Sequence, residues 1–241
     1  MHRRSQPTTI FVHGAGGGRW EWTIWERVFA ARGSRVLAPD LQPARGGLAA
    51  THIEDYAGQV VGWCADAQRP LLFVGASLGG LLALMAAPIA APVAIVLVNP
   101  LPPMGITPRP TPREHVDIVP WGTRRTLRGT RRALPDADDA ACLFAFRRWR
   151  DESAAVLRAA SEGIAIETPR CPVLIFASEH DDDVPQASGR ALADYLGAQF
   201  RVIPSASHVG PLLGRHAARI AEEAWQWSCH TTAAQADWRA V

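Results

Sequence analysis

Short apolar runs alternate with longer segments of helical periodicity over the first hundred residues and again after residue 168. The short runs are apolar on both faces and predict strands at residues 8–12, 35–38, 71–75, 93–98, 173–177 and 200–203. The longer segments predict helices at residues 20–32, 53–68, 78–87, 186–196 and 211–227, the third of them ended by Pro88. Such alternation indicates an α/β fold with a doubly wound, mainly parallel sheet of about six strands and helices on both faces.

One long segment interrupts this alternation. Residues 100–168 carry no strand signal, are rich in proline in their first third, and regain helical periodicity from about residue 140 to 160. Loops of this length in compact domains usually carry function, so the segment is expected to form a lid. The predicted organisation is a core of residues 1–100 and 169–228, an inserted helical lid at 101–168, and a loosely held C-terminal tail at 229–241.

Composition and charge narrow the classes of function. A chain of 241 residues with 48% hydrophobic side chains can bury one core, and a net charge of +2 does not favour nucleic acid as a partner. All 25 cationic residues are arginine, which excludes any mechanism that needs a lysine amine. Seven of these arginines fall between Arg109 and Arg132, so the expected lid carries a local positive charge.

The cysteines and the apolar runs predict neither a metal site nor a membrane segment. The 4 cysteines lie far apart, with no C-x-x-C pair and no histidine at metal-ligand spacing, so we expect no metal and no cofactor. The apolar run near the N-terminus is too short for a signal peptide, and none approaches the roughly 18 residues of a membrane span. These features predict a cytoplasmic protein with free thiols.

A glycine-rich turn around Ser77 is the first candidate for chemistry. The segment Gly75-Ala76-Ser77-Leu78-Gly79 follows a predicted strand and opens a predicted helix, which is the G-x-S-x-G elbow of a nucleophilic serine. Small residues let neighbouring backbone approach the turn, and the helix N-terminus points at the hydroxyl. The alternative is a serine that only caps a helix.

A serine nucleophile needs a base and an acid that orients the base. Asp181 follows the strand predicted at 173–177, and His208 follows the strand predicted at 200–203. The carboxyl ends of parallel strands meet at one edge of a sheet, where α/β proteins bind ligands. The order serine, acid, histidine therefore predicts a catalytic triad of Ser77, Asp181 and His208.

These motifs resemble those of the α/β-hydrolase family, and the resemblance covers nearly the whole chain. The family pattern D-x-x-V-P aligns Asp181 with the acid, although a slip of one residue to Asp182 remains open. Some members place the acid after the fourth strand, where this chain has Asn99. Ala206-Ser207-His208 is similar to the family's histidine turn.

The resemblance also implies an oxyanion hole. The glycine run that starts at His13 and Gly14 is similar to the family's H-G-x loop, so the backbone N–H groups of Ala15 and Leu78 are the expected donors, with Gly16 as the fallback for Ala15. The other interpretation of a glycine run before a helix is a phosphate site. His13 is expected to be a structural histidine of the turn.

Few residues precede the first predicted strand. In this feature the chain resembles the short branch of the family, which contains plant methyl-ester esterases and hydroxynitrile lyases. Lyases of this branch need a lysine that this chain lacks. We therefore expect a serine hydrolase that cleaves a carboxylic ester of a small molecule through an acyl-enzyme. The alternatives are a thioesterase acting on coenzyme A- or carrier-protein-bound acyl groups, a non-hydrolytic lyase or C–C hydrolase, and a ligand-binding receptor. The thioesterase alternative implies an acyl carrier protein as a macromolecular partner, and the sequence does not indicate an oligomeric state.

Three tryptophans follow the glycine run at positions that cannot share one helical face. They are Trp20, Trp22 and Trp25. At least one of them is expected to face the lid or the pocket mouth.

Overall fold

The structure is a computed structural model that describes residues 6–110 and 117–238. Part of the predicted cationic segment, residues 111–116, and the last three residues of the predicted tail lie outside the described residues. Its centre is a 6-stranded sheet of order β2-β1-β3-β4-β7-β8, and every pairing in it is parallel. The strands are β1 (Thr8–Val12), β2 (Val36–Leu37), β3 (Leu71–Ala76), β4 (Ala94–Val98), β7 (Val173–Ser178) and β8 (Gln199–Ile203). The predicted sheet class is therefore confirmed.

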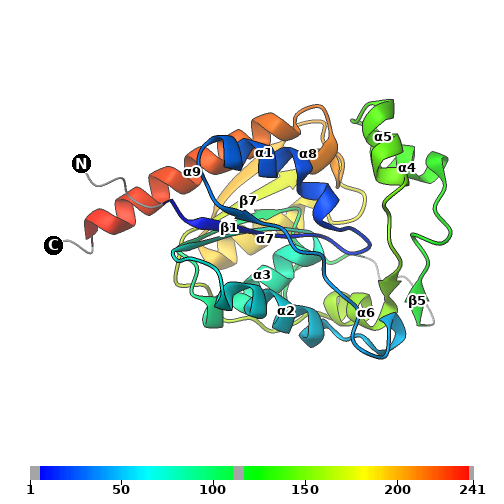
Figure 1. Ribbon diagram of the computed structural model, residues 1–241, viewed down its shortest axis with the longest axis horizontal. Coiled ribbons are helices and arrows are strands. Elements are labelled where there is room, and N and C mark those ends of the chain that lie inside the picture. The colour runs from blue at the N-terminus through cyan, green and yellow to red at the C-terminus, as the bar shows by residue number, and fades with distance from the viewer. Residues whose placement is uncertain (1–5, 111–116, 239–241) are drawn as a thin grey trace.

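Helices cover both faces of this sheet (Figure 1). One face carries α2 (Ile53–Ala65), α3 (Leu78–Ala90) and α7 (Gln186–Leu196), and the other carries the short helix η1 (Arg19–Trp22), α1 (Thr23–Ala31), α8 (Gly210–Leu213) and α9 (Ala217–Trp238). Alternate residues of the inner strands point into the two layers: Ile10 packs with α2 and α3, whereas Phe11 packs with α1. This alternation explains why the inner strands are apolar on both faces. The edge strands β2 and β8 are partly exposed.

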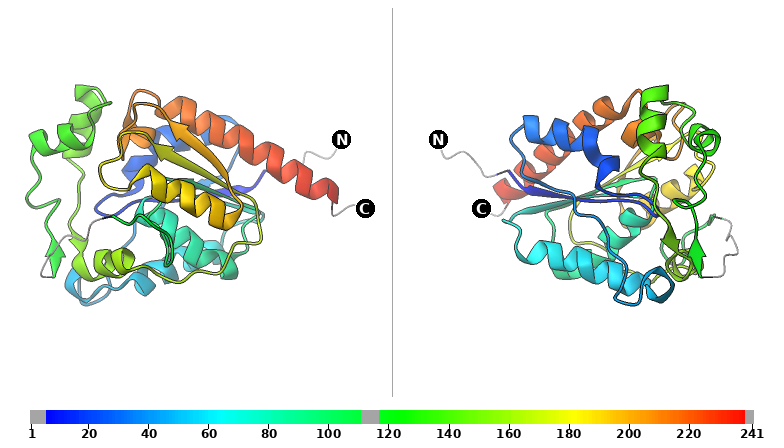
Figure 2. Two further views of the ribbon diagram at one scale, coloured as in Figure 1. Left: turned by 180° about the vertical axis from the view of Figure 1, so that it is seen from behind. Right: turned by 45° about the vertical axis from the view of Figure 1, so that its right-hand side comes forward.

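The segment 101–168, called the insertion below, lies across the carboxyl ends of the strands. It contains β5 (Ile118–Val119), α4 (Leu127–Ala133), α5 (Asp139–Phe146), β6 (Glu152–Ser153) and α6 (Ala154–Glu162), and it joins β4 to β7. Figure 2 shows it running from α6 on one side of the sheet to α4 and α5 on the other. The expected absence of strands is wrong here, because β5 and β6 form an antiparallel pair, which also divides the helix predicted at 140–160.

Helix bounds differ from the prediction at several places: residues 20–32 form η1 and α1, and α2 ends at Ala65. Helix α3 continues past Pro88 to Ala90, because a proline in the last turn costs few hydrogen bonds. The helix predicted at 211–227 is two helices, since Gly214 is extended and packs against Gly210. Where a loose tail was expected from Cys229 onward, α9 continues to Trp238.

Candidate active site

Ser77 occupies a strained turn between β3 and α3. Its φ of 52° and ψ of −120° lie outside the regions that side-chain-bearing residues usually adopt. Backbone hydrogen bonds hold the turn: the Ser77 N–H donates to the Val98 carbonyl at 3.0 Å, and the Ser77 carbonyl accepts from the N–H groups of Gly80 and Leu101, both at 3.0 Å. Ser77 is partly exposed between the buried Ala76 and Leu78. The backbone thus presents this hydroxyl at the carboxyl edge of the sheet.

The elbow depends on the absence of a side chain at position 79. A Cβ atom on Gly79 would lie 2.1 Å from the Val12 carbonyl oxygen and 2.5 Å from that of His13. Both are backbone atoms, so neither can rotate away. This close approach brings the loop after β1 against the first turn of α3.

We expect Gly79→Ala to destabilise the protein by more than about 3 kcal/mol, because the added methyl group separates two backbone segments. Gly62→Ala is the matched control, since a Cβ atom there meets nothing within 4 Å on the exposed face of α2. It should stabilise the protein by up to about 1 kcal/mol. Urea unfolding of both variants measures this difference. Equal stabilities would contradict the tight contact at Gly79.

Asp181 and His208 are brought together. The distance between His208 Nδ1 and Asp181 Oδ2 is 2.7 Å, and the Asp181 side chain is 1% exposed. Asp181 Oδ1 accepts hydrogen bonds from the N–H groups of Asp183 and Val184. These contacts aim the carboxylate at the imidazole, whereas the alternative acid, Asp182, is exposed. The carboxylate that contacts His208 is therefore that of Asp181.

The surroundings of His208 favour its protonated form. Burial by itself would lower the pKa of His208, but the charge of Asp181 and the hydrogen bond to it outweigh burial and raise the pKa to about 9. Nδ1 faces Asp181, which leaves Nε2 for a substrate or a nucleophile. An imidazole that gains this much from a neighbouring carboxylate is suited to accept a proton during a reaction.

Asn99 connects the histidine to the elbow. Its Nδ2 donates to the His208 carbonyl oxygen at 2.7 Å, and the preceding residue, Val98, accepts the Ser77 N–H. Asn99 thus supports the main chain of His208 from the position where some family members carry the acid. Within the described residues, Ser77 and His208 share no hydrogen bond. This contact often tightens only when substrate is bound.

The loop after β1 lies directly beside Ser77. A Cβ atom on Gly14 would be 3.3 Å from Ser77 Cβ. His13 is buried, and burial lowers the pKa of its imidazole to about 4. Its Nδ1 donates to the Gly14 carbonyl, and its Nε2 accepts a hydrogen bond from the Leu41 N–H. Both ring nitrogens are therefore occupied, as expected of a structural histidine. The expected donor Ala15 is partly exposed, whereas the fallback donor Gly16 gives its N–H to Glu152.

The three tryptophans divide as the sequence predicts. Trp20 faces the insertion, with its ring centroid 5.1 Å from that of Trp149 and 6.2 Å from that of Phe144. Trp22 and Trp25 are fully buried against the sheet. One aromatic residue of this group therefore anchors the insertion, and the other two belong to the core.

Contacts from the insertion reach the histidine turn as well. Asp136, between α4 and α5, accepts hydrogen bonds from the Oγ and N–H of Ser207, the residue before His208. Its backbone carbonyl accepts from the N–H of Arg215. The insertion is thus tied to the turn that carries His208.

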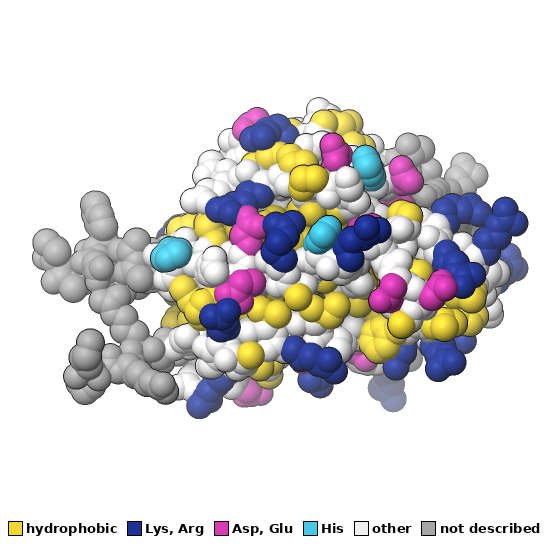
Figure 3. All heavy atoms as spheres, turned by 90° about the horizontal axis from the view of Figure 1, so that it is seen from above, with side chains coloured by type: hydrophobic (Ala, Val, Ile, Leu, Met, Phe, Trp, Pro, Cys, Tyr) yellow, Lys and Arg dark blue, Asp and Glu magenta, His cyan; other side chains and the backbone are white. Residues whose placement is uncertain are grey.

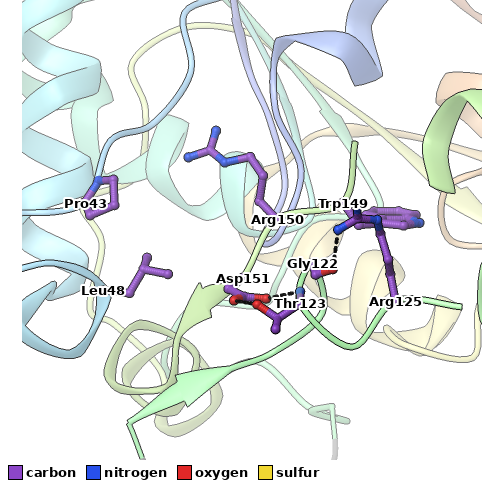
Figure 4. A pocket seen from close by; sticks show the side chains of 8 residues that line it. All are labelled: Pro43, Leu48, Gly122, Thr123, Arg125, Trp149, Arg150 and Asp151. Carbon is purple, nitrogen blue, oxygen red and sulfur yellow. Dashed lines mark hydrogen bonds between the residues drawn. The ribbon is translucent and has the colours of Figure 1, made fainter. Parts of the chain in front are cut away.

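Two hollows lie where the insertion meets the core. One has a volume of about 320 Å³ (Figure 4) and is lined by Pro43, Leu48, Gly122, Thr123, Arg125, Trp149, Arg150 and Asp151. The other, of about 440 Å³, is lined by Arg19, Trp20, Thr23, Asp40, Phe144 and Arg148. Neither is lined by Ser77 or His208. Figure 3 shows arginine side chains gathered at this end of the molecule.

Residues 6–110 and 117–238 contain no cluster of three or more histidine, cysteine or acidic residues that could hold a metal ion. In the same part of the chain, no helix has the length and apolarity that a bilayer crossing requires. All 4 cysteines are free.

Sequence reasoning missed three carboxylates that contact the site. Glu21 bonds the loop after β1, Glu152 bonds the same loop from the insertion, and Asp136 bonds the histidine turn. The signal for Glu21 is an acidic residue between two tryptophans, Trp20 and Trp22. Asp136 and Glu152 leave no local signal, because their partners are 71 and 136 residues away.

The sequence matches a known family, and the fold resembles several solved structures. A family model described as "Alpha/beta hydrolase family" matches residues 9–223. No curated protein matches the sequence. Similar solved structures include a pyrethroid hydrolase from Sphingobium faniae JZ-2, with a TM-score of 0.70, 20% identity, and coverage of 92% of this chain and 97% of that one. A methylesterase from Arabidopsis has a TM-score of 0.70 and 14% identity, over 92% and 99% of the two chains. An esterase from Thermogutta terrifontis has a TM-score of 0.68 and 18% identity, over 95% and 91%.

Proposed function

The chain belongs to the alpha/beta hydrolase family, and from this premise we propose that it is a serine hydrolase that cleaves a carboxylic ester through an acyl-enzyme intermediate. The observation that carries the proposal is the 2.7 Å contact between His208 Nδ1 and Asp181 at the sheet edge where the elbow presents Ser77. An oriented imidazole near a strained, accessible serine suits acyl transfer.

In the proposed first step, Ser77 Oγ attacks the ester carbonyl carbon while His208 Nε2 takes the hydroxyl proton. The carbonyl electron pair moves onto oxygen, and the N–H groups of Ala15 and Leu78 bind the oxyanion. When the tetrahedral intermediate collapses, the C–O bond to the alcohol breaks. His208 returns the proton to the leaving alkoxide, so an alcohol departs and the acyl group stays on Ser77.

Water completes the proposed cycle. His208 removes a proton from a water molecule, which attacks the acyl carbon, and a second oxyanion forms at the same donors. Collapse breaks the bond to Ser77 Oγ, which recovers its proton from His208. Asp181 remains ionised and stabilises the imidazolium in both steps. The products are a carboxylic acid and an alcohol.

The solved structures named above carry related activities in their names, a pyrethroid hydrolase and two esterases. They agree with the proposed ester chemistry without specifying the acyl or alcohol group of this chain's substrate. Fold alone does not determine reaction.

A thioesterase acting on carrier-bound acyl groups is the second candidate, and the surface of the insertion favours it. Exposed arginines that form no ion pair within the described residues stand on or beside α4 and α5: Arg124, Arg128, Arg132 and Arg147. A cationic surface beside a reactive centre attracts acidic carriers and coenzyme A. The same triad would serve either substrate.

A matched pair of substrates separates the two candidates. We expect the chain to hydrolyse a butyrate oxygen ester faster than the butyrate thioester of a small thiol, and the joint variant Arg124→Gln, Arg128→Gln, Arg132→Gln to leave both rates unchanged. Preference for butyryl-coenzyme A, lost in that joint variant, would favour the thioesterase. Failure of a fluorophosphonate to label Ser77 would reject both and favour a receptor.

A further inference from the structure

Two buried carboxylates take alternate N–H groups of the glycine loop, defined as residues 13–18. The Gly14 N–H donates to Glu21 Oε2 at 3.1 Å, and the Gly16 N–H donates to Glu152 Oε2 at 3.0 Å. The N–H of Ala15, between them, donates to no group in the part of the chain that the structure describes. The Gly17 N–H donates to the Gly14 carbonyl at 3.2 Å, so the N–H groups of Gly14, Gly16 and Gly17 are all used.

Glu21 is fixed in place on the core side of the loop. It is 4% exposed, and its own N–H donates to the Gly18 carbonyl at 3.0 Å. A Cβ atom on Gly17 would lie 2.2 Å from Glu21 Oε1, so the carboxylate fills the space that glycine leaves open. The Glu21 carboxylate therefore packs closely against the loop, and a side chain at position 17 would displace it.

Glu152 holds the loop from the opposite side, on the insertion. It is 4% exposed, and its Oε1 accepts hydrogen bonds from Tyr56 Oη and from the Ser153 N–H, both at 2.8 Å. The neighbouring Arg150 N–H donates to the Gly16 carbonyl at 2.8 Å. Gly16 is thus bound to the insertion through both its N–H and its C=O.

We propose that Glu21 and Glu152 are positioning residues that clamp the glycine loop from both sides, so that the Ala15 N–H is the loop's donor to the oxyanion and the Gly16 N–H is not. The clamp acts at the reacting centre, because Gly14 lies against Ser77. A displaced donor weakens catalysis more than it weakens substrate binding, since the oxyanion exists only in the transition state and intermediates. This inference rests on the proposed ester hydrolysis.

The charge of Glu21 determines which variant is the conservative one. Burial is the largest cause that raises the pKa of Glu21 to about 7, and the charge of Asp40 acts in the same direction. The hydrogen bond from the Gly14 N–H and the charges of His208 and Arg150 oppose this rise. A protonated carboxyl still offers its carbonyl oxygen to the Gly14 N–H. Glutamine keeps the same acceptor and shape, whereas alanine removes the acceptor.

The test compares turnover with the affinity for a tetrahedral adduct. Full-length Glu21→Ala, Glu152→Ala and Glu21→Gln are assayed with p-nitrophenyl butyrate and with an alkyl trifluoromethyl ketone, which forms an oxyanion on the serine. Each alanine variant is expected to lower kcat by up to about 100-fold, to leave KM within about twofold, and to raise the ketone Ki in proportion to the loss of kcat. Fluorophosphonate titration of active sites corrects for any unfolded fraction.

Conservative replacements separate positioning from a structural role. Glu21→Gln should restore most of the turnover, and Tyr56→Phe, which removes only the phenol contact to Glu152, should lower kcat less than Glu152→Ala. Alanine variants whose kcat per titrated site and ketone Ki match the wild-type values would overturn the clamp. A wild-type chain that neither hydrolyses the ester nor binds the ketone would instead reject the proposed hydrolase itself.

Discussion

Replacing Ser77 by alanine is expected to lower kcat on an activated ester by about 10⁴- to 10⁶-fold. The substitution removes the nucleophile of the first proposed step and leaves the turn in place, because the backbone hydrogen bonds of Ser77 do not involve its hydroxyl. Initial rates with p-nitrophenyl butyrate measure the loss, and circular dichroism checks the fold.

Ser161→Ala in α6 is the matched control for the Ser77 variant. This serine is partly buried and lies outside the sheet edge that carries the proposed triad. Its replacement should leave kcat close to the wild-type value. Turnover of Ser77→Ala within tenfold of wild type would contradict acyl-enzyme chemistry at Ser77.

Asp181→Asn should cost about 10⁴-fold in kcat, because an amide in place of the carboxylate no longer stabilises the imidazolium and favours the wrong tautomer of His208. Asp182→Asn is the matched control, since its side chain is an exposed neighbour of the same charge. It should cost little. Equal losses of kcat in the two variants would contradict the role of Asp181 as the acid, despite its 2.7 Å contact with His208.

The same pair determines the pH dependence. His208 must be neutral to accept a proton, and its pKa is raised to about 9, so kcat/KM of the wild type is expected to rise with pH above neutrality. Removing the negative charge of Asp181 lowers the pKa of His208, and the rising limb of Asp181→Asn should move to lower pH. A pH profile of both enzymes measures the shift. A common limb would contradict the electrostatic role of Asp181.

The inner strands and the order of the proposed catalytic residues were accessible from the sequence because each depends on a local pattern. β1 and β3 are apolar on both faces because helices cover both, and a run of apolar residues reports that directly. The strained turn at Ser77 leaves its signal in the flanking glycines, since no other residue fits at position 79. Strand, elbow and helix therefore constrain one another within a few residues.

Other features depend on contacts that local patterns do not contain. β5 and β6 have two residues each, which is too short for a period to appear, and they pair across more than thirty residues of chain. Pro88 predicts a helix end, but the last turn of α3 tolerates it. Glu21 and Glu152 are acidic residues in a buried setting, and only the distant N–H groups of the glycine loop explain why they are there.

The attachment of the insertion to Gly16 has a consequence for protein engineering. Exchanging whole lids between related enzymes is a natural route to new substrate preferences, but in this chain such an exchange would also remove Arg150 and Glu152 from the glycine loop. A chimera that retains Asp136, which accepts hydrogen bonds from the histidine turn, together with residues 149–153 would keep the contacts to both segments. The boundaries between exchangeable and indispensable sequence therefore fall inside the insertion and not at its two ends.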